Sequence, residues 1–503
     1  MPLLGEPCIC NPSSPPNGKT KGKVLRQARS TFCLKKEYTN HKDSAAYAPL
    51  CAVVKSKMIN LSVGKPYKVL LRYILPLFLS VVFQQIYTIA DSIVAGKFIG
   101  EEALAAVGNS YEITLVLLAF AFGCNMGASI VTAKNFGAGD YVEMKSAIYT
   151  SLLMTLGVTV VLAAVGFGVA KPLLALLNTP TEIMADSLAY LYIYLAGLLF
   201  LFFYNVSTGI FAALGDSVTP FVFLVISSVA NVFMDILFVA VFKMGVKGVA
   251  WATFICQGVS SVAAFSVLAW QLKKVKTERK PKMFSKAALK DFLLVGVPST
   301  LQQSFISVGN IALQGLINTF GTSTIAGYAA AVKFNNFAVT SMHQVGNGVS
   351  NYTAQNLAAE KQDRVKDGFK WGLVIASGIG LLFFFLYFFF NRQIMLLFLN
   401  RDSKAAIEVG PDFLITVSPF YAIIASKLVA DGVLRGAEKM GHFMVATFTD
   451  LALRVGFAFL LASTYLGARG IWWAWPIGWL IAVGLSVAFY FAGVWKKKSK
   501  TEI

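Results

Sequence analysis

The sequence predicts an all-α integral membrane protein with twelve transmembrane helices in two pseudo-symmetric six-helix bundles. Three observations carry this prediction: an apolar composition, a regular series of apolar blocks and an internal repeat. Of the 503 residues, 56% are hydrophobic and 14% are charged, with 41 Phe and a mean hydropathy of +0.65. Soluble domains carry about 25% charged residues. The composition therefore excludes an ordinary soluble enzyme, a disordered chain and a fibrous repeat protein.

The apolar blocks set the number of spans. A helix needs about 20 apolar residues to cross a bilayer, and the chain alternates such blocks with short polar segments. An even number of spans places both ends of the series on one side of the membrane. We expect the twelve spans at residues 67–94, 104–134, 145–169, 183–213, 218–242, 246–271, 289–318, 324–356, 368–390, 406–434, 440–464 and 469–494.

Basic residues predict the orientation. Lys and Arg gather between spans six and seven, between spans eight and nine, and after the last span, where Lys496 begins a basic run. Cytoplasmic loops of membrane proteins carry an excess of Lys and Arg. We therefore expect a multi-pass protein of the plasma membrane with both termini in the cytoplasm. The net charge of +19 fits this distribution and does not indicate nucleic-acid binding.

The first 57 residues differ from the rest. They are polar, and they lack the apolar stretch of a signal peptide. We interpret residues 1–57 as a disordered cytoplasmic tail that need not belong to the native protein.

Three short motifs recur at a spacing of about 222 residues. Six spans separate the copies, so both halves have the same orientation, as in transporters built from parallel repeats. The predicted units are an N-terminal lobe at 58–271, a basic linker at 272–288, a C-terminal lobe at 289–495 and a basic tail at 496–503. The recurring pairs are Leu75-Pro76 with Val297-Pro298, Thr132–Asn135 with Thr353–Asn356, and Gly245–Ala252 with Gly467–Ala474.

Polar residues share one face of the first span. Gln84, Tyr87 (or Thr88) and Asp91 are spaced by three and four residues, which aligns them on a helix. An ionisable group in a span costs about 2.5 to 3.5 kcal/mol, so Asp91 is a candidate cation ligand; the alternative is a solvated carboxylate near the outer interface. Pro76 earlier in the span predicts a kink, because proline removes a backbone donor.

A second polar face lies in the fifth span. Asn231 and Asp235 are four residues apart, and their amide and carboxylate oxygens suit sodium, while the carboxylate alone suits a proton. Thr253 and Gln257 in span six and Asn205 in span four are further candidates. The alternative for each is a hydrogen bond between helices that only stabilises the bundle.

The C-terminal half carries different ionisable groups. Lys427 and Asp431 are four residues apart and are expected to form an internal ion pair. Arg435 lies near a cytoplasmic span end, and we expect it to extend toward the headgroups. Lys333 and Arg454 have no evident partner in their own spans, which leaves pairing or a cavity-facing role open.

Motifs for enzymatic chemistry are missing. The sequence has three His without metal-binding spacing and no phosphate-binding loop of the ATPase type. We expect neither an enzyme nor a bound cofactor. The sequence favours no metal other than sodium at the cation site.

The chain resembles the multidrug and toxic compound extrusion (MATE) family. The resemblance rests on the segment from Gln84 to Gly96, on Ala103–Gly108, on Gly137–Asp140 and on Gln355-Asn356. It implies two six-helix bundles arranged in a V. It also implies a cation site of Asp91, Asn231, Asp235 and Thr253, a cavity lined by Gln84, Tyr87 and Asn205, and a bending role for Pro76.

The resemblance further implies a transporter driven by a coupled ion. We expect a monomeric antiporter that exports organic, cationic and amphipathic compounds from within a lipid membrane. Inward flux of protons or sodium would drive it by alternating access. The alternative is a flippase of the same superfamily for a lipid-linked or oligosaccharide substrate, whose cleft would need basic residues such as Lys333 and Arg454.

Overall fold

The described chain is built almost entirely of helices. The computed structural model describes the backbone of residues 58–98, 101–176, 179–396 and 404–496, and their side chains except at 89–109, 111–112 and 404–406. The predicted tail at 1–57 and most of the basic tail at 496–503 lie outside these residues. The helices of the first half are α2 (Pro66–Phe98), α3 (Glu101–Ala138), α4 (Tyr141–Leu176), α5 (Thr181–Ala196), α6 (Leu198–Ala213), α7 (Val218–Ile236), η2 (Leu237–Val241) and α8 (Val246–Lys274). Those of the second half are α9 (Lys286–Ile317), η3 (Asn318–Phe320), α10 (Thr322–Ala358), α11 (Gln362–Met395), α12 (Lys404–Val417), η4 (Ser418–Phe420), α13 (Tyr421–Gly436), α14 (Met440–Ala462) and α15 (Ala468–Phe491).

The helices follow the predicted series of spans. Among the described residues, ten helical segments are long and apolar enough to cross a membrane, and the bent pair α5 and α6 makes an eleventh. Helix α10 occupies the position of the eighth predicted span, and it is 37 residues long. Its polar side chains, such as Asn335 and Asn351, are buried inside the protein. This helix is therefore more polar than the others because its neighbours are protein rather than lipid.

The fourth span, expected at residues 183–213, is formed by two helices that meet at a bend. Helices α5 and α6 meet at an angle of 49°, with Gly197 between them. A Cβ atom at Gly197 would lie 3.0 Å from the ring of Phe254 in α8. The bend thus occurs at a residue without a side chain, where α8 packs closely against the backbone.

The backbone repeats along with the sequence. Three residues with positive φ in the first half have counterparts with positive φ at equivalent positions of the second half, and two glycines are replaced there by glutamate. A glutamate in this conformation carries backbone strain that glycine avoids. The pairs are Gly139 (75°) with Glu360 (60°), Gly215 (77°) with Glu438 (58°), and Gly245 (60°) with Gly467 (53°).

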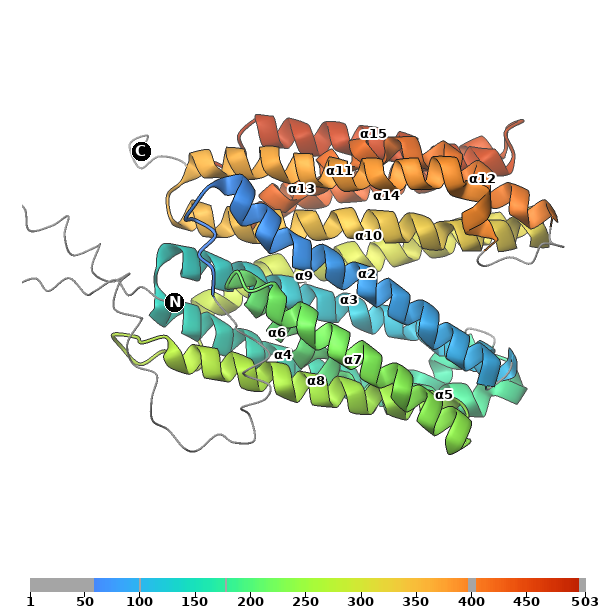
Figure 1. Ribbon diagram of the computed structural model, residues 1–503, viewed down its shortest axis with the longest axis horizontal. Helices are drawn as coiled ribbons and strands as arrows, with labels where there is room; N and C mark the ends of the chain where they lie inside the picture. The colour runs from blue at the N-terminus through green and yellow to red at the C-terminus, as the bar shows by residue number, and fades with distance from the viewer. Residues whose placement is uncertain (1–57, 99–100, 177–178, 397–403, 497–503) are drawn as a thin grey trace, which may run out of the picture. The chain divides into compact units, whose positions relative to one another are not determined.

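The two halves meet along several helix pairs. Helix α3 packs along α9 and α10, and α2 packs along α10 and α11; α2 and α9 run between the two groups of helices in Figure 1. A Cβ atom at Gly123 would lie 2.6 Å from the carbonyl oxygen of Gly296, so these glycines let α3 and α9 approach closely. A small apolar cluster spans both halves and includes Met126, Leu434 and Phe443.

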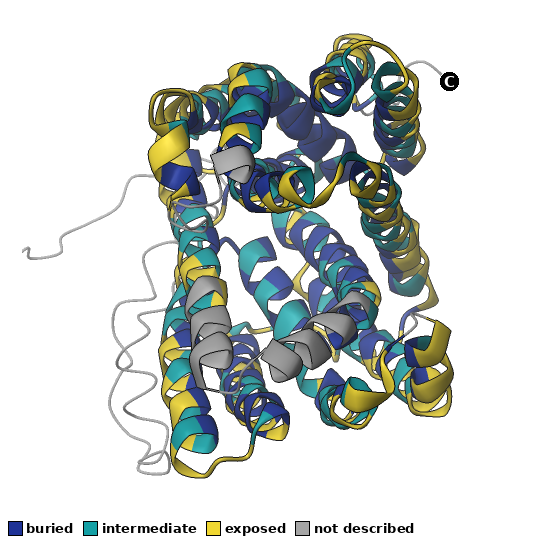
Figure 2. Ribbon diagram, turned by 90° about the vertical axis from the view of Figure 1, so that its right-hand side faces the viewer, coloured by how far each residue is buried: buried dark blue, intermediate teal, exposed yellow. Residues whose placement is uncertain are grey.

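The described helices bury one face and expose another. Buried residues face the interior of each helix group, and exposed residues lie around the outside (Figure 2). Many of the exposed residues are large and apolar, including Val160 (58% exposed), Val259 (66%) and Phe233 (70%). Such a surface is unfavourable in water and favourable in lipid. It supports a membrane location for these helices.

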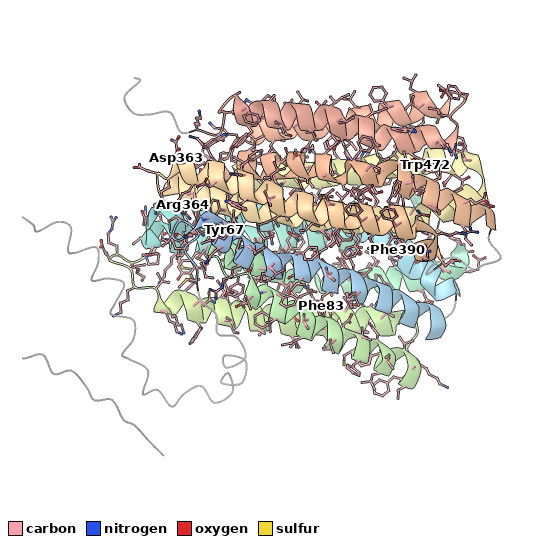
Figure 3. All side chains as sticks on the ribbon, turned by 45° about the horizontal axis from the view of Figure 1, so that its top comes forward. Tyr67, Phe83, Asp363, Arg364, Phe390 and Trp472 are labelled. Atoms are coloured by element: carbon pink, nitrogen blue, oxygen red, sulfur yellow. The ribbon has the colours of Figure 1, made fainter. Side chains whose placement is uncertain are left out.

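The two ends of the helix series carry different residues. We call the end at which α2 begins, and at which residues 275–285 join α8 to α9, the linker end. Figure 3 places Asp363 and Arg364 at this end and Phe390 and Trp472 at the opposite end. The Arg364 guanidinium donates to the carbonyl oxygens of Gly64 (2.7 Å) and Leu61 (3.1 Å). Basic side chains of the second half thereby hold the segment that leads into α2.

Candidate cation site and interlobe contacts

A polar cluster joins α2 to α7 in the first half. The hydroxyl group of Tyr87 donates a hydrogen bond to Oδ1 of Asn231. Asn231 is 3% exposed and Asp235, one turn further along α7, is 0% exposed. The Cys256 thiol of α8 lies beside Asn231 and close enough to Asp235 to interact with its charge. The predicted pair of Asn231 and Asp235 is thus buried between three helices.

Asp91 belongs to the same region of the backbone. Helices α2 and α7 pack together. Phe83 of α2 contacts Phe221 of α7, and Tyr87 contacts Asn231 further along both helices, so the two helices run in the same direction (Figure 1). Asp91 follows Tyr87 by one turn, as Asp235 follows Asn231. The side chain of Asp91 lies outside the described residues. Its predicted contact with Asp235 therefore stays a prediction.

The other predicted cavity residues lie in different surroundings. Thr253 and Gln257 of α8 line a pocket of about 30 Å³ together with Tyr190 and Tyr194 of α5. A pocket of this size holds one or two water molecules and no organic substrate. The side chain of Gln84 is exposed.

Asn205 makes its contacts within the bundle. Its amide nitrogen donates to the Leu201 carbonyl oxygen in the same helix at 2.8 Å. Its own carbonyl oxygen accepts a hydrogen bond of 2.6 Å from Asn125 in α3, which also donates to the Thr208 hydroxyl at 3.3 Å. The sequence analysis missed Asn125, although an amide within an apolar span was a detectable signal.

Pro76 lies within one continuous helix. Helix α2 runs through Pro76 from Pro66 to Phe98. The Ser80 hydroxyl donates to the Pro76 carbonyl oxygen at 2.8 Å. Proline leaves a carbonyl of the preceding turn without its usual donor, so this position can bend at lower cost than the rest of α2.

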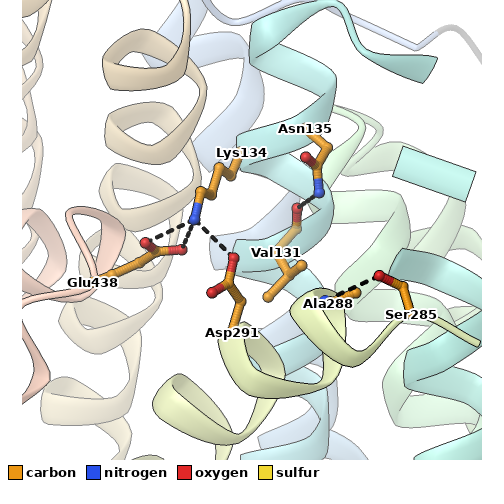
Figure 4. A network of polar contacts seen from close by, with 7 residues as sticks. All are labelled: Val131, Lys134, Asn135, Ser285, Ala288, Asp291 and Glu438. Atoms are coloured by element: carbon orange, nitrogen blue, oxygen red, sulfur yellow. Dashed lines mark hydrogen bonds and ion pairs between the residues drawn. The ribbon is translucent and has the colours of Figure 1, made fainter. Parts of the chain in front are cut away.

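Three charged residues connect the halves at the linker end. The Lys134 ammonium group of α3 lies 2.8 Å from Oδ2 of Asp291 in α9 and 2.9 Å from Oε1 of Glu438, between α13 and α14. Figure 4 shows the three side chains converging from these elements. We call this group the linker-end latch. The sequence analysis missed it because its members lie far apart in the chain.

The second copy of the repeated motif makes the reciprocal contact. Gln355 occupies the position in α10 that Lys134 occupies in α3. Its side chain accepts from the Leu61 backbone nitrogen at 2.8 Å and donates to the Ala213 carbonyl oxygen at 2.7 Å. Nearby, Ser129 donates to Asn351 at 2.9 Å. Each half thus reaches across the interface through the same motif, and polar contacts join the two halves at the linker end.

The charged residues of the second half form a buried group on α13. The predicted pair is confirmed, since Lys427 Nζ lies 2.6 Å from Asp431 Oδ2. The expectation for Arg435 is wrong: this side chain is 1% exposed, and Nη1 donates to Asn347 at 2.9 Å. Helix α3 of the other half covers Arg435. The expectation rested only on the closeness of Arg435 to the end of its own span, which gives no information about a covering helix. The Arg454 guanidinium lies 4.5 Å from the centre of the Trp475 ring, and Lys333 is exposed.

Metal-binding clusters are absent from the part of the chain that is described. No group of three or more His, Cys, Asp or Glu residues in these ranges could hold a metal ion.

Comparisons with known proteins agree with this architecture. A family model described as MatE matches residues 76–237 and 298–460, one stretch in each half and together more than half of the chain. The probable multidrug resistance protein YpnP of Bacillus subtilis is 28% identical over 442 residues, covering 88% of this chain and 98% of that protein. The multidrug resistance protein PmpM of Pseudomonas aeruginosa is 24% identical over 453 residues, covering 84% and 92%.

A solved structure confirms the fold class. An outward-facing MATE family transporter of the MOP superfamily superimposes with a TM-score of 0.82 at 24% identity, covering 88% of this chain and 100% of that one. The predicted all-α fold of twelve helices in two bundles is confirmed. The prediction that the protein is not an enzyme is also confirmed. The chain belongs to the MATE family of membrane transporters.

Proposed function

We propose that the protein is a secondary antiporter that exports small organic compounds in exchange for protons or sodium. The observation that carries this proposal is the fully buried Asp235 beside Asn231 in a membrane helix. A carboxylate in such a position is costly unless it binds a cation or a proton. The sequence offers no ATP-binding loop as an alternative source of energy.

The coupling site consists of Asp235 and Asn231, with Asp91 as the second acid. Two carboxylates near one another repel when both are ionised, and a shared proton or a sodium ion relieves this repulsion. Asn231 Oδ1 already accepts from Tyr87, so cation binding would rearrange a contact between α2 and α7. Thr253 of α8 completes the proposed set. The coupling ion acts as a transported substrate, and no cofactor is proposed.

Alternating access requires an interface that can open and close. The contacts at the linker end include hydrogen bonds and ion pairs, and water replaces such contacts at little net cost. We propose that the linker end is the cytoplasmic side of a plasma-membrane protein and that this structure is closed there. Binding of the cation favours one conformation and binding of the exported compound favours the other.

The exported compounds are proposed to be cationic and amphipathic. Two of the relatives are named multidrug resistance proteins, which supports organic compounds as substrates. The acids of the first half and the aromatic side chain of Tyr87 suit a cationic group. We propose that a monomer carries out transport, with membrane lipid around it.

A flippase for a lipid-linked substrate is the second candidate. The buried basic residues Lys427, Arg435 and Arg454 in the second half favour it, because a phosphate would need such partners. The buried acid of the first half argues against it. Both candidates use the same conformational change.

Transport in inside-out vesicles tests the antiporter. With sodium or an acidic pH imposed alone in the lumen, ethidium is expected to accumulate with one of the two gradients and to leak out when that gradient is collapsed. Protein-free vesicles under the same gradients give the passive background. Ethidium accumulation that matches the background with both gradients would contradict the proposal, and lipid translocation under those conditions would favour the flippase.

The orientation makes a separate prediction. Lys276 lies in the exposed segment of the linker end, and Tyr465 lies between α14 and α15 at the opposite end with 98% exposure. With the native cysteines replaced, an impermeant maleimide added to intact cells should label Tyr465→Cys and leave Lys276→Cys unlabelled until the cells are opened. The reverse pattern would show that the linker end is outside.

A further inference from the structure

Helix α13 presents three charged residues on one buried face. Lys427, Asp431 and Arg435 are spaced by four residues and are 4%, 2% and 1% exposed. Asp431 makes its direct contacts elsewhere: Oδ2 pairs with Lys427 at 2.6 Å, and Oδ1 accepts from the Ser486 hydroxyl at 2.7 Å. Its charge also acts on Arg435 one turn away, so one carboxylate serves two buried cations on this face.

Arg435 is the cation that remains. Its Nη1 donates to the neutral amide of Asn347 at 2.9 Å and contacts the sulfur of Met126 at 3.2 Å. The ring of Phe443 lies 4.9 Å from Cζ. Nε has no hydrogen-bond acceptor, and no carboxylate in the described part of the chain forms an ion pair with this guanidinium. A buried guanidinium that shares its nearest carboxylate with another cation and forms no ion pair of its own is costly to desolvate, so the position requires a reason beyond packing.

The guanidinium lies at the interface between the halves. Met126 belongs to α3 of the first half, whereas Asn347 and Phe443 belong to the second half. Close by, the rings of Phe122 in α3 and His343 in α10 are 6.2 Å apart. Further along α3 toward the linker end, Ser129 contacts Asn351 and Lys134 forms its ion pairs with Asp291 and Glu438. Separation of these contacts would move α3 away from α10 and α13 and would leave the Arg435 side chain facing the opening.

We propose that Arg435 is a binding subsite for a carboxylate on the exported compound, presented when the linker end opens. A guanidinium holds a carboxylate through two parallel N–H donors, and the Nε–H of Arg435 has no partner in the closed state. The proposal rests on the proposed export function. Together with the acid of the first half, it favours amphipathic compounds that carry both a cationic and an acidic group.

The subsite supplies a conformational preference as well as affinity. In the closed state Arg435 pairs with an amide and a thioether, while in the open state it could pair with a carboxylate. A compound that binds the open state better than the closed state shifts the population toward it. The subsite thus couples recognition of an acidic group to opening on the side from which the compound enters.

A matched pair of dyes tests the subsite. Rhodamine B has a free carboxyl group, and rhodamine B ethyl ester has the same cationic ring system with this group blocked. Binding of each dye to the purified full-length chain in detergent is measured by fluorescence polarisation, with protein-free micelles subtracted. The wild type should bind both dyes. Arg435→Gln should weaken binding of rhodamine B by about tenfold or more, because a hydrogen bond to a charged group contributes about 1.5 to 3 kcal/mol.

The ester provides the control. Arg435→Gln should change ester binding by less than about twofold, which also shows that the variant is folded. Arg435→Lys keeps the charge without the planar fork, so it should retain ester binding and lose part of the affinity for rhodamine B. Arg435→Lys decides the question if Arg435→Gln does not fold.

Other outcomes overturn the proposal. Equal losses for both dyes in Arg435→Lys would show a purely structural role, and unchanged rhodamine B affinity in both variants would show that the carboxylate binds elsewhere. A wild type that binds neither dye also excludes the subsite. Because binding is measured without an ion gradient, a failure of export in vesicles would overturn the proposed function and leave the subsite result intact.

Discussion

Asp235→Asn is expected to reduce gradient-driven export to the background of protein-free vesicles. Asp235 is 0% exposed in α7, and an amide of the same size can neither take up a proton nor supply the negative charge that attracts sodium. The substitution also removes an ionisable group from a span, so insertion into the membrane should not suffer. The measurement is ethidium accumulation in inside-out vesicles under the gradient that drives the wild type.

A second buried acid of the same half provides the control. Asp216 accepts from the Thr219 backbone nitrogen at 3.1 Å and from the Thr219 hydroxyl at 2.6 Å, at the start of α7. Asp216→Asn keeps an oxygen that can accept from the Thr219 backbone nitrogen, and Asn and Asp are about equally favourable at helix starts. The variant should therefore lose little stability and remain coupled to the gradient. Wild-type export by Asp235→Asn would place the coupling site elsewhere, with Lys427, Asp431 and Arg454 as the next candidates.

Asn231→Ala refines the same experiment. The Asn231 amide oxygen can act as a neutral ligand for sodium, and a proton does not require one. Removing the amide should therefore impair a sodium-driven exchanger more than a proton-driven one. The same comparison for Asp91→Asn tests whether the predicted second acid takes part.

The series of spans could be predicted because each span carries its own signal. Lipid selects apolar residues over about 20 positions, and this information is local. The bend at Gly197 was not predicted, since a glycine in a span is compatible with both a straight and a bent helix. The polar composition of α10 has its cause in tertiary structure, because buried amides such as Asn335 and Asn351 face neighbouring helices.

In the candidate site, contacts within one helix could be predicted from the sequence, and contacts between distant segments could not. Asn231 and Asp235 were found because helical spacing places them on one face, and Lys427 and Asp431 were paired for the same reason. Lys134, Asp291 and Glu438 come from three helices or loops, and nothing in one sequence indicates that they meet. The repeated motif was visible at both positions, yet its role became clear only from the partners of Lys134 and Gln355 across the interface.

Glu438 offers the sharpest test of the linker-end latch. It has a φ of 58°, where its counterpart Gly215 has 77°, and a left-handed conformation costs a non-glycine residue about 1 to 2 kcal/mol. Glu360 carries the same backbone strain, with a φ of 60° where its repeat counterpart is Gly139, but its side chain is exposed. Glycine should relieve strain at both positions, while only Glu438→Gly removes a partner of Lys134.

The two glycine variants should therefore behave differently. Glu360→Gly is expected to raise the melting temperature by about one degree or less, because the extra freedom of glycine in the unfolded chain offsets part of the strain relief, and to leave the closed state unchanged. Glu438→Gly loses an ion pair whose side chains are 38% and 23% exposed, and screening by solvent limits such a pair to about 1 kcal/mol.

In the Glu438→Gly variant, a cysteine at Met126, which the closed interface covers, should then react with an impermeant maleimide about fivefold faster from the linker end. High salt should reduce the difference from the parent, because screening weakens the ion pair. Equal labelling rates in Glu438→Gly, Glu360→Gly and the parent would show that apolar packing and hydrogen bonds close the linker end without the latch.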